Sequence, residues 1–324
     1  MIRTFVLEND RLVGVDVSDP RCGDAIWLDL FNPTKEEEVS TESLLGLALP
    51  SREEMEEIEI SSRLYVEDGA YFMTATVPAY VEGGAPEIAP VTFILAGKKL
   101  VTIRYHEPRA FKTFPQRAEK ASTGCTGGDT ILITLLEAIV DRLADILERA
   151  SRDVETISRD IFEARSKKAS SRSRDFQALL KAIGQKEDLA SNLRDSLLSL
   201  QRLAGFLAHA ATTIKTMKDV RARIKTVSRD ILSLADHTTF LSQKINFLLD
   251  ATLGMISIEQ NAIIKIFSVA AVVFLPPTLV ASIYGMNFEV MPELGWSFGY
   301  PWALGLMVLS AILPFLWFRS KGWL

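Results

Sequence analysis

Cysteine and histidine are scarce in this sequence, and their scarcity excludes several classes of protein. The 324 residues include only two cysteines, Cys22 and Cys125. Two cysteines cannot build a disulfide framework or a cysteine-rich zinc site, and they agree with a reducing cytosolic environment. The three histidines, His106, His209 and His237, are far apart in the sequence and form no metal-ligating pair on one helix.

An excess of basic residues is also lacking. The chain carries 36 Lys and Arg against 41 Asp and Glu, a net charge of −5. Nucleic-acid binding depends on Lys and Arg contacts to phosphate, so we expect no nucleic acid as partner. The glycine pairs at 83–84 and 127–128 lack the spacing of a nucleotide-binding loop. Because no paired catalytic groups are recognisable either, we expect neither an enzyme nor a catalytic cofactor.

Charge nearly disappears from the last 60 residues. Positions 265–324 hold three basic and two acidic residues, whereas the preceding 264 hold 33 and 39, a net of −6. Two runs, 266–283 and 301–318, contain no charged residue. Each approaches the ~20 apolar residues with which a helix crosses a bilayer. The sequence therefore predicts membrane spans at about 263–284 and 299–318.

The alternative is a pair of helices buried in the core of a soluble domain. Aromatic residues such as Trp296 and Trp317 lie at the ends of the runs, as in membrane-interface belts. Basic residues, including Lys265 and Arg319, flank the outer ends, and the connecting loop 285–298 has no Lys or Arg. The positive-inside rule then predicts that both termini are cytoplasmic and that the loop is external.

Residues 1–115 are predicted to form a cytoplasmic α+β domain. Runs with strand character lie at 3–7, 12–17, 25–30, 71–81 and 90–105, the last as a hairpin that turns at Gly97. Two helix starts carry capping boxes, Thr34 with Glu37 and Ser51 with Glu54.

Residues 116–262 are predicted to form a cytoplasmic helical hairpin and a stalk helix. Apolar residues recur every three or four positions from 132 to 161, and a second helix is expected at about 175–210. A third helix from about 215 to 283 would be ~100 Å long, which implies packing against other helices or other copies. Between the first two helices lies a basic loop, 165–174, which is either a solvated turn or a contact with anionic lipid.

One face of the first predicted span contains most of its small and polar residues. Their spacing alternates between three and four, which defines one stripe along a helix: Asn261, Ile264, Ser268, Ala271, Leu275, Thr278 and Ser282. Polar groups at membrane depth need partners or water. The stripe therefore predicts a pore lining, or alternatively polar contacts within and between helices. A pore would require several copies around a cyclic axis.

The triplet Gly285, Met286, Asn287 follows this span directly. A bend at Gly285 would present the Asn287 amide at the mouth, and a ring of such amides suits a cation that keeps its water. Mg²⁺ dehydrates reluctantly, so hydrogen bonding to the hydrated ion avoids a large cost.

The stretch 258–301, IEQNAIIKIFSVAAVVFLPPTLVASIYGMNFEVMPELGWSFGYP, resembles the CorA magnesium (magnesium/cobalt) transporters almost throughout. The order of domains extends the resemblance to the whole chain. The resemblance implies a funnel-shaped homopentamer in a bacterial-type inner membrane, with Gly285, Met286 and Asn287 as the selectivity filter. It implies Mg²⁺ as transported ion and as regulatory ligand, and membrane lipid and divalent cations as partners.

The resemblance also implies roles for single positions. It places Asn261 at the inner mouth, and Leu275 and Thr278 along the pore. Ile264 and Phe267 would form an apolar inner constriction. The basic collar would be Arg319 and Lys321. Cytoplasmic Mg²⁺ is thought to close such channels by binding acidic residues between subunits; Asp230 and Asp236 are the candidates here, against a solvated stalk face as the alternative.

The sequence thus predicts a passive, potential-driven channel for uptake of hydrated Mg²⁺, with Co²⁺ and Ni²⁺ as further candidate ions. Moving a divalent charge through ~100 mV is worth about 4.6 kcal/mol, so no nucleotide is needed. One alternative is a zinc transporter of the same superfamily, although Met-Pro-Glu-Leu after the triplet favours the magnesium branch. Another is a membrane-tethered helical signalling protein, in which the stripe only holds copies together.

Overall fold

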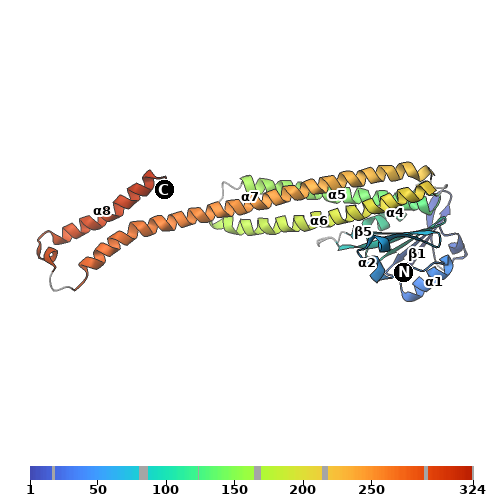
Figure 1. Ribbon diagram of the computed structural model, residues 1–324, viewed down its shortest axis with the longest axis horizontal. Coiled ribbons are helices and arrows are strands. Elements are labelled where there is room, and N and C mark those ends of the chain that lie inside the picture. The colour runs from blue at the N-terminus through green and yellow to red at the C-terminus, as the bar shows by residue number, and fades with distance from the viewer. Residues whose placement is uncertain are drawn as a thin grey trace. The chain divides into compact units, whose positions relative to one another are not determined.

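The computed structural model describes residues 1–16, 19–79, 87–122, 124–163, 169–213, 218–287 and 291–322. Its contacts divide the chain into two compact units. The first comprises Met1–Lys167 and Gln177–Leu248, and the second comprises Lys168–Phe176 and Leu249–Leu324. The longest helix begins in the first unit and ends in the second (Figure 1).

A seven-stranded sheet organises the first unit, in the order β2-β1-β3-β7-β6-β5-β4. All neighbouring strands are antiparallel except β3 and β7. The strands are β1 (Ile2–Glu8), β2 (Arg11–Val15), β3 (Trp27–Phe31), β4 (Leu64–Glu67), β5 (Ala70–Ala79), β6 (Glu87–Ala96) and β7 (Lys99–Arg104). Each of the five predicted runs overlaps at least one strand, although β2 ends at Val15 and β3 begins only at Trp27. Positions 17, 80 and 81 of the predicted runs lie outside the described residues. The hairpin turns at Gly97, whose φ of +59° favours glycine.

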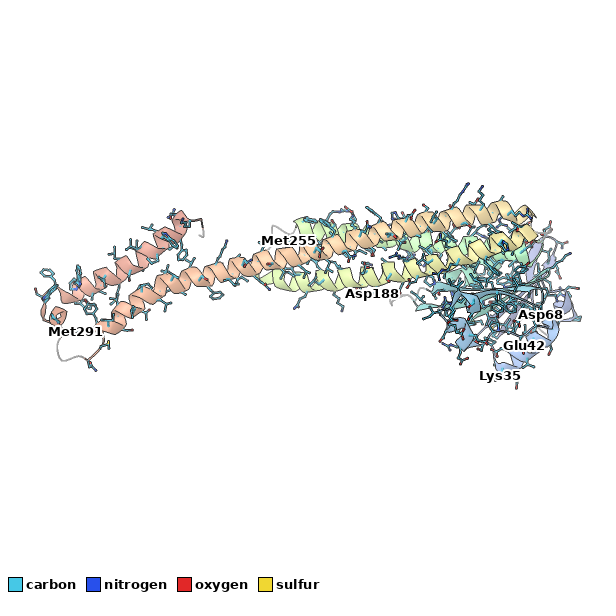
Figure 2. The ribbon with its side chains drawn as sticks, in the orientation of Figure 1. Lys35, Glu42, Asp68, Asp188, Met255 and Met291 are labelled. Atoms are coloured by element: carbon cyan, nitrogen blue, oxygen red, sulfur yellow. The ribbon has the colours of Figure 1, made fainter. Side chains whose placement is uncertain are left out.

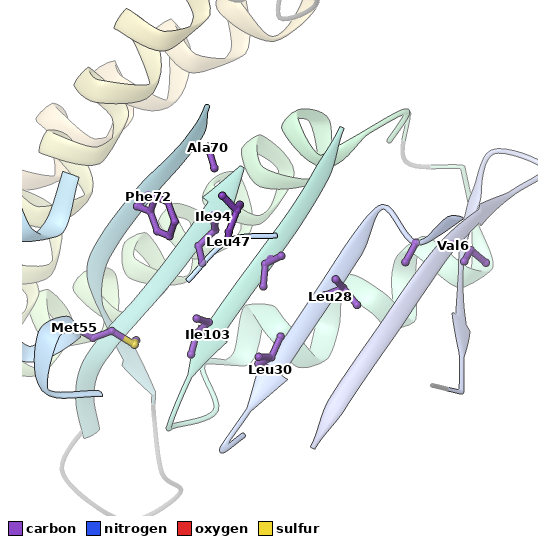
Figure 3. Packing of buried hydrophobic residues seen from close by; sticks show 11 residues of the cluster. Val6, Leu28, Leu30, Leu47, Met55, Ala70, Phe72, Ile94 and Ile103 are labelled. Atoms are coloured by element: carbon purple, nitrogen blue, oxygen red, sulfur yellow. The ribbon is translucent and has the colours of Figure 1, made fainter. Parts of the chain in front are cut away.

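Short helices cover the sheet: α1 (Lys35–Leu45), α2 (Arg52–Glu56), α3 (Ile60–Arg63) and α4 (Arg109–Lys120). Both predicted capping boxes are present, at Thr34 with Glu37 and at Ser51 with Glu54. On one face, apolar side chains of the strands pack with Leu47 and Met55 (Figure 3).

Aromatic rings join α4 to the sheet. Trp27 stacks on Phe5 with ring centroids 4.5 Å apart, and Phe114 of α4 lies 5.6 Å from the same indole. Phe111, also on α4, lies 6.5 Å from Trp27. Trp27, Phe111 and Phe114 are almost fully buried. This packing holds α4 in place although its N-cap, Pro108, makes no side-chain capping bond.

A buried ion pair ties β3 to β7. Arg104 donates from Nε and Nη2 to the two carboxylate oxygens of Asp29, at 3.0 and 2.8 Å. Both side chains are at most 1% exposed. Thr102 donates a further hydrogen bond to Asp29 at 2.8 Å, and the Arg104 guanidinium lies 4.5 Å from the centre of the Phe31 ring. Each carboxylate oxygen therefore has a donor, as a buried charge requires.

Three long helices complete the first unit: α5 (Gly128–Glu163), most of α6 (Ala169–Thr213) and the first part of α7 (Lys218–Tyr284). They lie side by side (Figure 1) and are joined by polar contacts. Lys186 on α6 pairs with Asp153 on α5 at 2.5 Å, and Ser242 on α7 donates to Glu187 on α6 at 2.8 Å.

The predicted extent of the second long helix was too short. The backbone of residues 169–174 is helical and belongs to α6, whereas the sequence analysis assigned it to the basic loop. These residues include no Gly or Pro, and Ala and Arg favour helix. Residues 165–168, the rest of that loop, lie outside the described residues, so the two hypotheses for its role stay open.

Gly128 is the first residue of α5 and lies against the turn between β6 and β7. We expect the lack of a side chain at this position to matter for stability. A Cβ at this position would lie 2.6 Å from the backbone nitrogen of Leu100, and no flexible side chain could move to relieve the clash. Gly128→Ala should destabilise the first unit by about 1–3 kcal/mol. Gly205→Ala in α6 is the matched control, because its Cβ would meet nothing within 4 Å.

The control should stabilise the protein by about 0.5–1 kcal/mol, since alanine is the better helix former. Thermal unfolding of the two purified variants measures both effects. Equal melting temperatures for the two variants would contradict the close approach of α5 to β7.

The second unit contains the apolar end of α7 and the helix α8 (Gly299–Ser320), with a 3₁₀ turn at Pro292–Gly295 between them. The prediction of one uninterrupted helix is confirmed, because α7 has 67 residues and continues through Pro276 and Pro277. Each proline removes one N–H and so leaves the carbonyl four residues earlier without its helical donor.

Candidate functional site

Both apolar helices of the second unit expose the surfaces that a soluble core helix would bury. The most apolar 18-residue windows within Val220–Tyr284 and Gly299–Ser320 are only 6% and 11% buried. Apolar side chains project along both helices (Figure 2). The α8 helix has 22 residues, or ~33 Å, which matches a hydrocarbon core of ~30 Å. These features favour membrane spans over the alternative of two buried core helices.

The predicted polar stripe lies on an uncovered face of α7. Ile264 is 60% exposed and Leu275 is 65% exposed. The remaining members are also exposed except Ser268, which is half-buried: Asn261, Ala271, Thr278 and Ser282. Phe267, the second residue of the predicted constriction, is 71% exposed. The described part of the chain leaves most of this stripe uncovered.

A different face of α7 is the less exposed one. Val269 is only 6% exposed, and Val273 and Val280 are half-buried. Other apolar residues of the same span are exposed: Ile263 at 48%, Ile266 at 68% and Phe274 at 70%. The described part of the chain therefore shields only a small part of this span and leaves most of the polar stripe available to other copies or to water.

Thr278 shows how one polar group of the stripe is satisfied. Its hydroxyl donates to the carbonyl of Phe274 on the same helix at 2.7 Å. Hydrogen bonding within the helix was one of the alternatives to a pore lining for the polar residues of the stripe, and Thr278 makes such a bond. It leaves the hydroxyl oxygen able to accept a further hydrogen bond on the exposed face.

The Gly285-Met286-Asn287 triplet follows Tyr284, the last residue of α7. The Gly285 N–H bonds to the Ala281 carbonyl at 2.9 Å, which closes the last turn of the helix. A Cβ on Gly285 would lie 3.1 Å from that carbonyl oxygen, so a larger residue would crowd the turn. Met286 and Asn287 are exposed. Residues 288–290 lie outside the described residues, and the chain resumes at Met291 (Figure 2).

The two residues of the predicted basic collar are exposed at the end of α8. Arg319 lies in the last turn, and Lys321 is the C-cap residue. Positive charge is favourable there, because the helix dipole places partial negative charge at its C-terminus.

The candidate regulatory residues belong to no metal-binding group in the described part of the chain. Asp230 and Asp236 are both exposed on α7 in the first unit. Among the described residues of this chain, no group of three or more His, Cys, Asp or Glu side chains could hold a metal ion. A Mg²⁺ site within one subunit is therefore not supported by the described part of the chain.

Asp230 nevertheless faces an acidic row that the sequence analysis missed. Desolvation raises the pKa of the Asp141 carboxyl above its ordinary value, and the negative charges of Glu137, Asp145 and Asp230 add to this shift. Glu137, Asp141 and Asp145 lie on α5 at intervals of four residues and therefore share one helix face. This spacing could have revealed the acidic row in the sequence.

Asp141→Asn should raise the melting temperature at neutral pH. An acid whose pKa is raised by folding destabilises the folded state when it is ionised, and this penalty vanishes below both its folded and unfolded pKa values. The gain from Asp141→Asn should therefore shrink as the pH falls through the range in which carboxyl groups titrate. Thermal unfolding between pH 7 and pH 4 measures the trend.

Glu155→Gln is the control of opposite sign. The Lys244 ammonium, 2.5 Å away, lowers the pKa of the Glu155 carboxyl through their hydrogen bond. Removing this charge should lower the melting temperature at neutral pH. A shift in the same direction for both variants would contradict the assignment of repulsion at Asp141.

Solved structures share the fold. The complete structure of the CorA magnesium transporter from Methanocaldococcus jannaschii matches with a TM-score of 0.78 at 19% identity, covering 100% of this chain and 99% of that one. The ZntB cytoplasmic domain from Vibrio parahaemolyticus is more distant. It has a TM-score of 0.57 at 10% identity and covers 79% of this chain and 97% of that one.

Sequence comparison is more specific. The magnesium transport protein CorA of Pasteurella multocida is 39% identical over 325 residues, covering 100% of both chains. The model of the family described as CorA-like Mg²⁺ transporter protein matches residues 23–320. This match confirms the resemblance found in the sequence. The chain belongs to the family of CorA-like Mg²⁺ transporter proteins.

Proposed function

We propose that this chain is the subunit of a passive channel through which the membrane potential drives uptake of hydrated Mg²⁺. The observation that carries the proposal is the exposed polar stripe of α7, which leads along an apolar helix to Asn287. The relative from Pasteurella multocida, named a magnesium transport protein, supports the choice of ion. Members of the family are ion transporters, which agrees with the expectation that the chain is not an enzyme.

The stripe of one helix requires copies to enclose a path for ions. We infer a homopentamer in which each α7 turns its exposed stripe toward a common axis, while its less exposed face, which includes Val269, turns away. In this arrangement the amides of Asn287 form a ring at one mouth of the path. Asn261 lies at the opposite mouth, and Ile264 and Phe267 form an apolar constriction next to it.

The distribution of charge sets the orientation in the membrane. Lys265, Arg319 and Lys321 flank the outer ends of the two spans, whereas residues 285–298 contain no Lys or Arg. We infer that both termini are cytoplasmic in a bacterial-type inner membrane and that Asn287 faces the outside. Arg319 and Lys321 would then surround the inner mouth as a basic collar.

Chemistry favours a hydrated cation at the outer ring. The side-chain carbonyl of Asn287 can accept hydrogen bonds from coordinated water, so Mg²⁺ need not lose its tightly held shell there. Co²⁺ and Ni²⁺ are divalent and similarly hydrated, and we expect them to pass as well. Zn²⁺ transport is the alternative within the same fold, and a signalling protein without a pore is the alternative of another class.

Ion flux into liposomes tests the proposal. Purified full-length protein should carry Mg²⁺ inward when the vesicle interior is negative, and the flux should not need a proton gradient. Zinc flux that exceeds magnesium flux and depends on a proton gradient would favour the zinc transporter. Assembly of the protein without any flux would favour the signalling protein.

Regulation by cytoplasmic Mg²⁺ is part of the same proposal. The described residues hold no metal-binding cluster within one subunit, so acidic residues of two subunits would have to combine. Asp230 and Asp236 are exposed and therefore accessible to a neighbouring copy. Flux should fall as Mg²⁺ on the Arg319 side of the membrane rises, and a constant flux would contradict the regulation without affecting the assignment of the pore.

A further inference from the structure

The second half of β5 lacks a neighbouring strand on one of its edges. The first residue of β4, Leu64, lies opposite Met73, so β4 pairs with only the first four residues of β5. Residues 74–79 continue to pair with β6 on the other edge. The backbone N–H and C=O groups on the unpaired edge therefore need other partners.

Two serines of α6 take the place of the missing strand at Thr76, where α6 passes beside β5 (Figure 1). The Thr76 N–H donates to the Ser199 hydroxyl at 2.9 Å, and the Ser196 hydroxyl donates to the Thr76 carbonyl at 2.6 Å. Ser196 is 0% exposed. The rings of Tyr71 on β5 and Phe206 on α6, with centroids 6.2 Å apart, extend the contact. One face of α6 is thus held against the edge of the sheet.

Arg63, the last residue of α3, reaches the same place from the other side. Its Nη1 donates to the Thr76 hydroxyl oxygen at 3.3 Å, and its Nε donates to the Glu57 carbonyl. Both acceptors are neutral, and the side chain is half-buried. Among the described residues Arg63 forms no ion pair, although glutamates occupy positions 53, 54, 56, 57 and 59 just before it. Its charge is therefore not compensated by this chain.

Arg202 brings a second positive charge to this place. It follows Ser199 by three residues and so lies on the same side of α6, one turn further along. Burial lowers the pKa of the Arg63 guanidinium below its ordinary value, and the positive charge of Arg202 adds to this shift. No carboxylate of the described residues opposes the effect. Because arginine stays protonated in proteins, two positive charges face each other here without a counterion.

We propose that Arg63 and Arg202, together with the Thr76 hydroxyl, form a binding site for a small phosphate-bearing anion where α6 meets β5. The planar fork of a guanidinium matches the oxygens of a phosphate, and the hydroxyl can donate a further hydrogen bond. A bound phosphate group replaces the repulsion between the two arginines by attraction to both. It therefore strengthens the contact of α6 with the sheet. The site lies in the first unit and does not depend on the ion that the protein carries.

Amide hydrogen exchange of the full-length protein in detergent tests the site. The probes are sodium phosphate and ATP, each with EDTA and compared with sodium chloride at the same ionic strength. Exchange of the Thr76 amide, which donates to Ser199, should slow at least about threefold, because a ligand stabilises the state that it binds. Slowing by both probes assigns the site to a phosphate group, and slowing by ATP alone assigns it to a nucleotide. Unchanged exchange with both probes would overturn the proposal.

Arg202→Gln is the variant that identifies the residues. Arg202 is exposed and lies outside the hydrogen bonds that hold Thr76, so the fold should be retained. Loss of one charged contact should weaken binding of the effective probe at least about tenfold, measured as the concentration that gives half of the slowing. Arg52→Gln is the matched control, because this exposed arginine already pairs with Glu56. Its binding should stay unchanged.

Arg63→Lys separates recognition of phosphate from general attraction between charges. Lysine keeps the positive charge but loses the planar fork, so binding should weaken by several-fold. Equal binding by the unchanged protein and Arg202→Gln would overturn the site, as would equal weakening by Arg202→Gln and Arg52→Gln. Mg²⁺ flux has no part in these measurements, so failure of the proposed channel would leave the test of this site intact.

Discussion

Replacing Asn287 with leucine should abolish Mg²⁺ flux into liposomes while the subunits still assemble. Leucine has nearly the size of asparagine but cannot accept a hydrogen bond from the water around the ion. A hydrogen bond to a charged group is worth about 1.5–3 kcal/mol, and each subunit of a ring would lose one. The loss of even one such interaction at the limiting barrier predicts a fall in flux of at least about tenfold.

The control for this prediction lies in the same loop. Ser297→Ala removes a hydroxyl from an exposed residue that follows the 3₁₀ turn and has no proposed role in the path of the ion. Its flux should remain close to that of the unchanged protein. Chemical cross-linking of both variants checks that the oligomer forms. Retained Mg²⁺ flux in an assembled Asn287→Leu protein would remove Asn287 from the selectivity filter.

Helical periodicity explains why so much of the ion path could be predicted from the sequence. The stripe from Asn261 to Ser282 is a local pattern on one uninterrupted helix, so spacing alone places its members on one face. The structure adds that this face is exposed, whereas Val269 on another face is buried. The residue roles within the filter and the constriction stay predictions, because they depend on other copies of the chain.

Elements fixed by packing rather than by local pattern were not predicted. The α4 helix contains Pro115 and lacks a capping side chain, so its sequence gives no clear helix start. It forms because Phe111 and Phe114 bury their rings against Trp27, which is far away in the sequence. The edge strand β4 has only four residues and depends on its pairing with β5. The predicted division of the chain at 115 and 262 remains untested.

The buried pair of Asp29 and Arg104 could not be predicted for the same reason. The two residues are 75 positions apart and meet only because β3 and β7 pair in parallel. On sequence alone each is an ordinary charged residue in a strand. Their burial makes them the polar contact with the largest expected effect on the stability of the sheet domain.

Asp29→Ala should destabilise the sheet by about 3–5 kcal/mol, because it leaves the Arg104 guanidinium buried without its counterion. Amide hydrogen exchange of β3 and β7 in the full-length protein should accelerate by roughly a hundredfold or more, since exchange reports the free energy of local opening. The exposed ion pair of Arg52 and Glu56 is the matched control. Glu56→Ala should cost less than about 1 kcal/mol.

Replacing both members of the buried pair separates the loss of a contact from the cost of an unpaired charge. Asp29→Leu combined with Arg104→Met removes both charges and keeps apolar volume in the space between Phe31 and Phe111. This double variant should be more stable than Asp29→Ala, because no charge remains buried without a partner. If the double variant were the less stable of the two, the main contribution of the pair would be its hydrogen bonds, including those from Thr102 to Asp29 and from Arg104 to the His106 carbonyl.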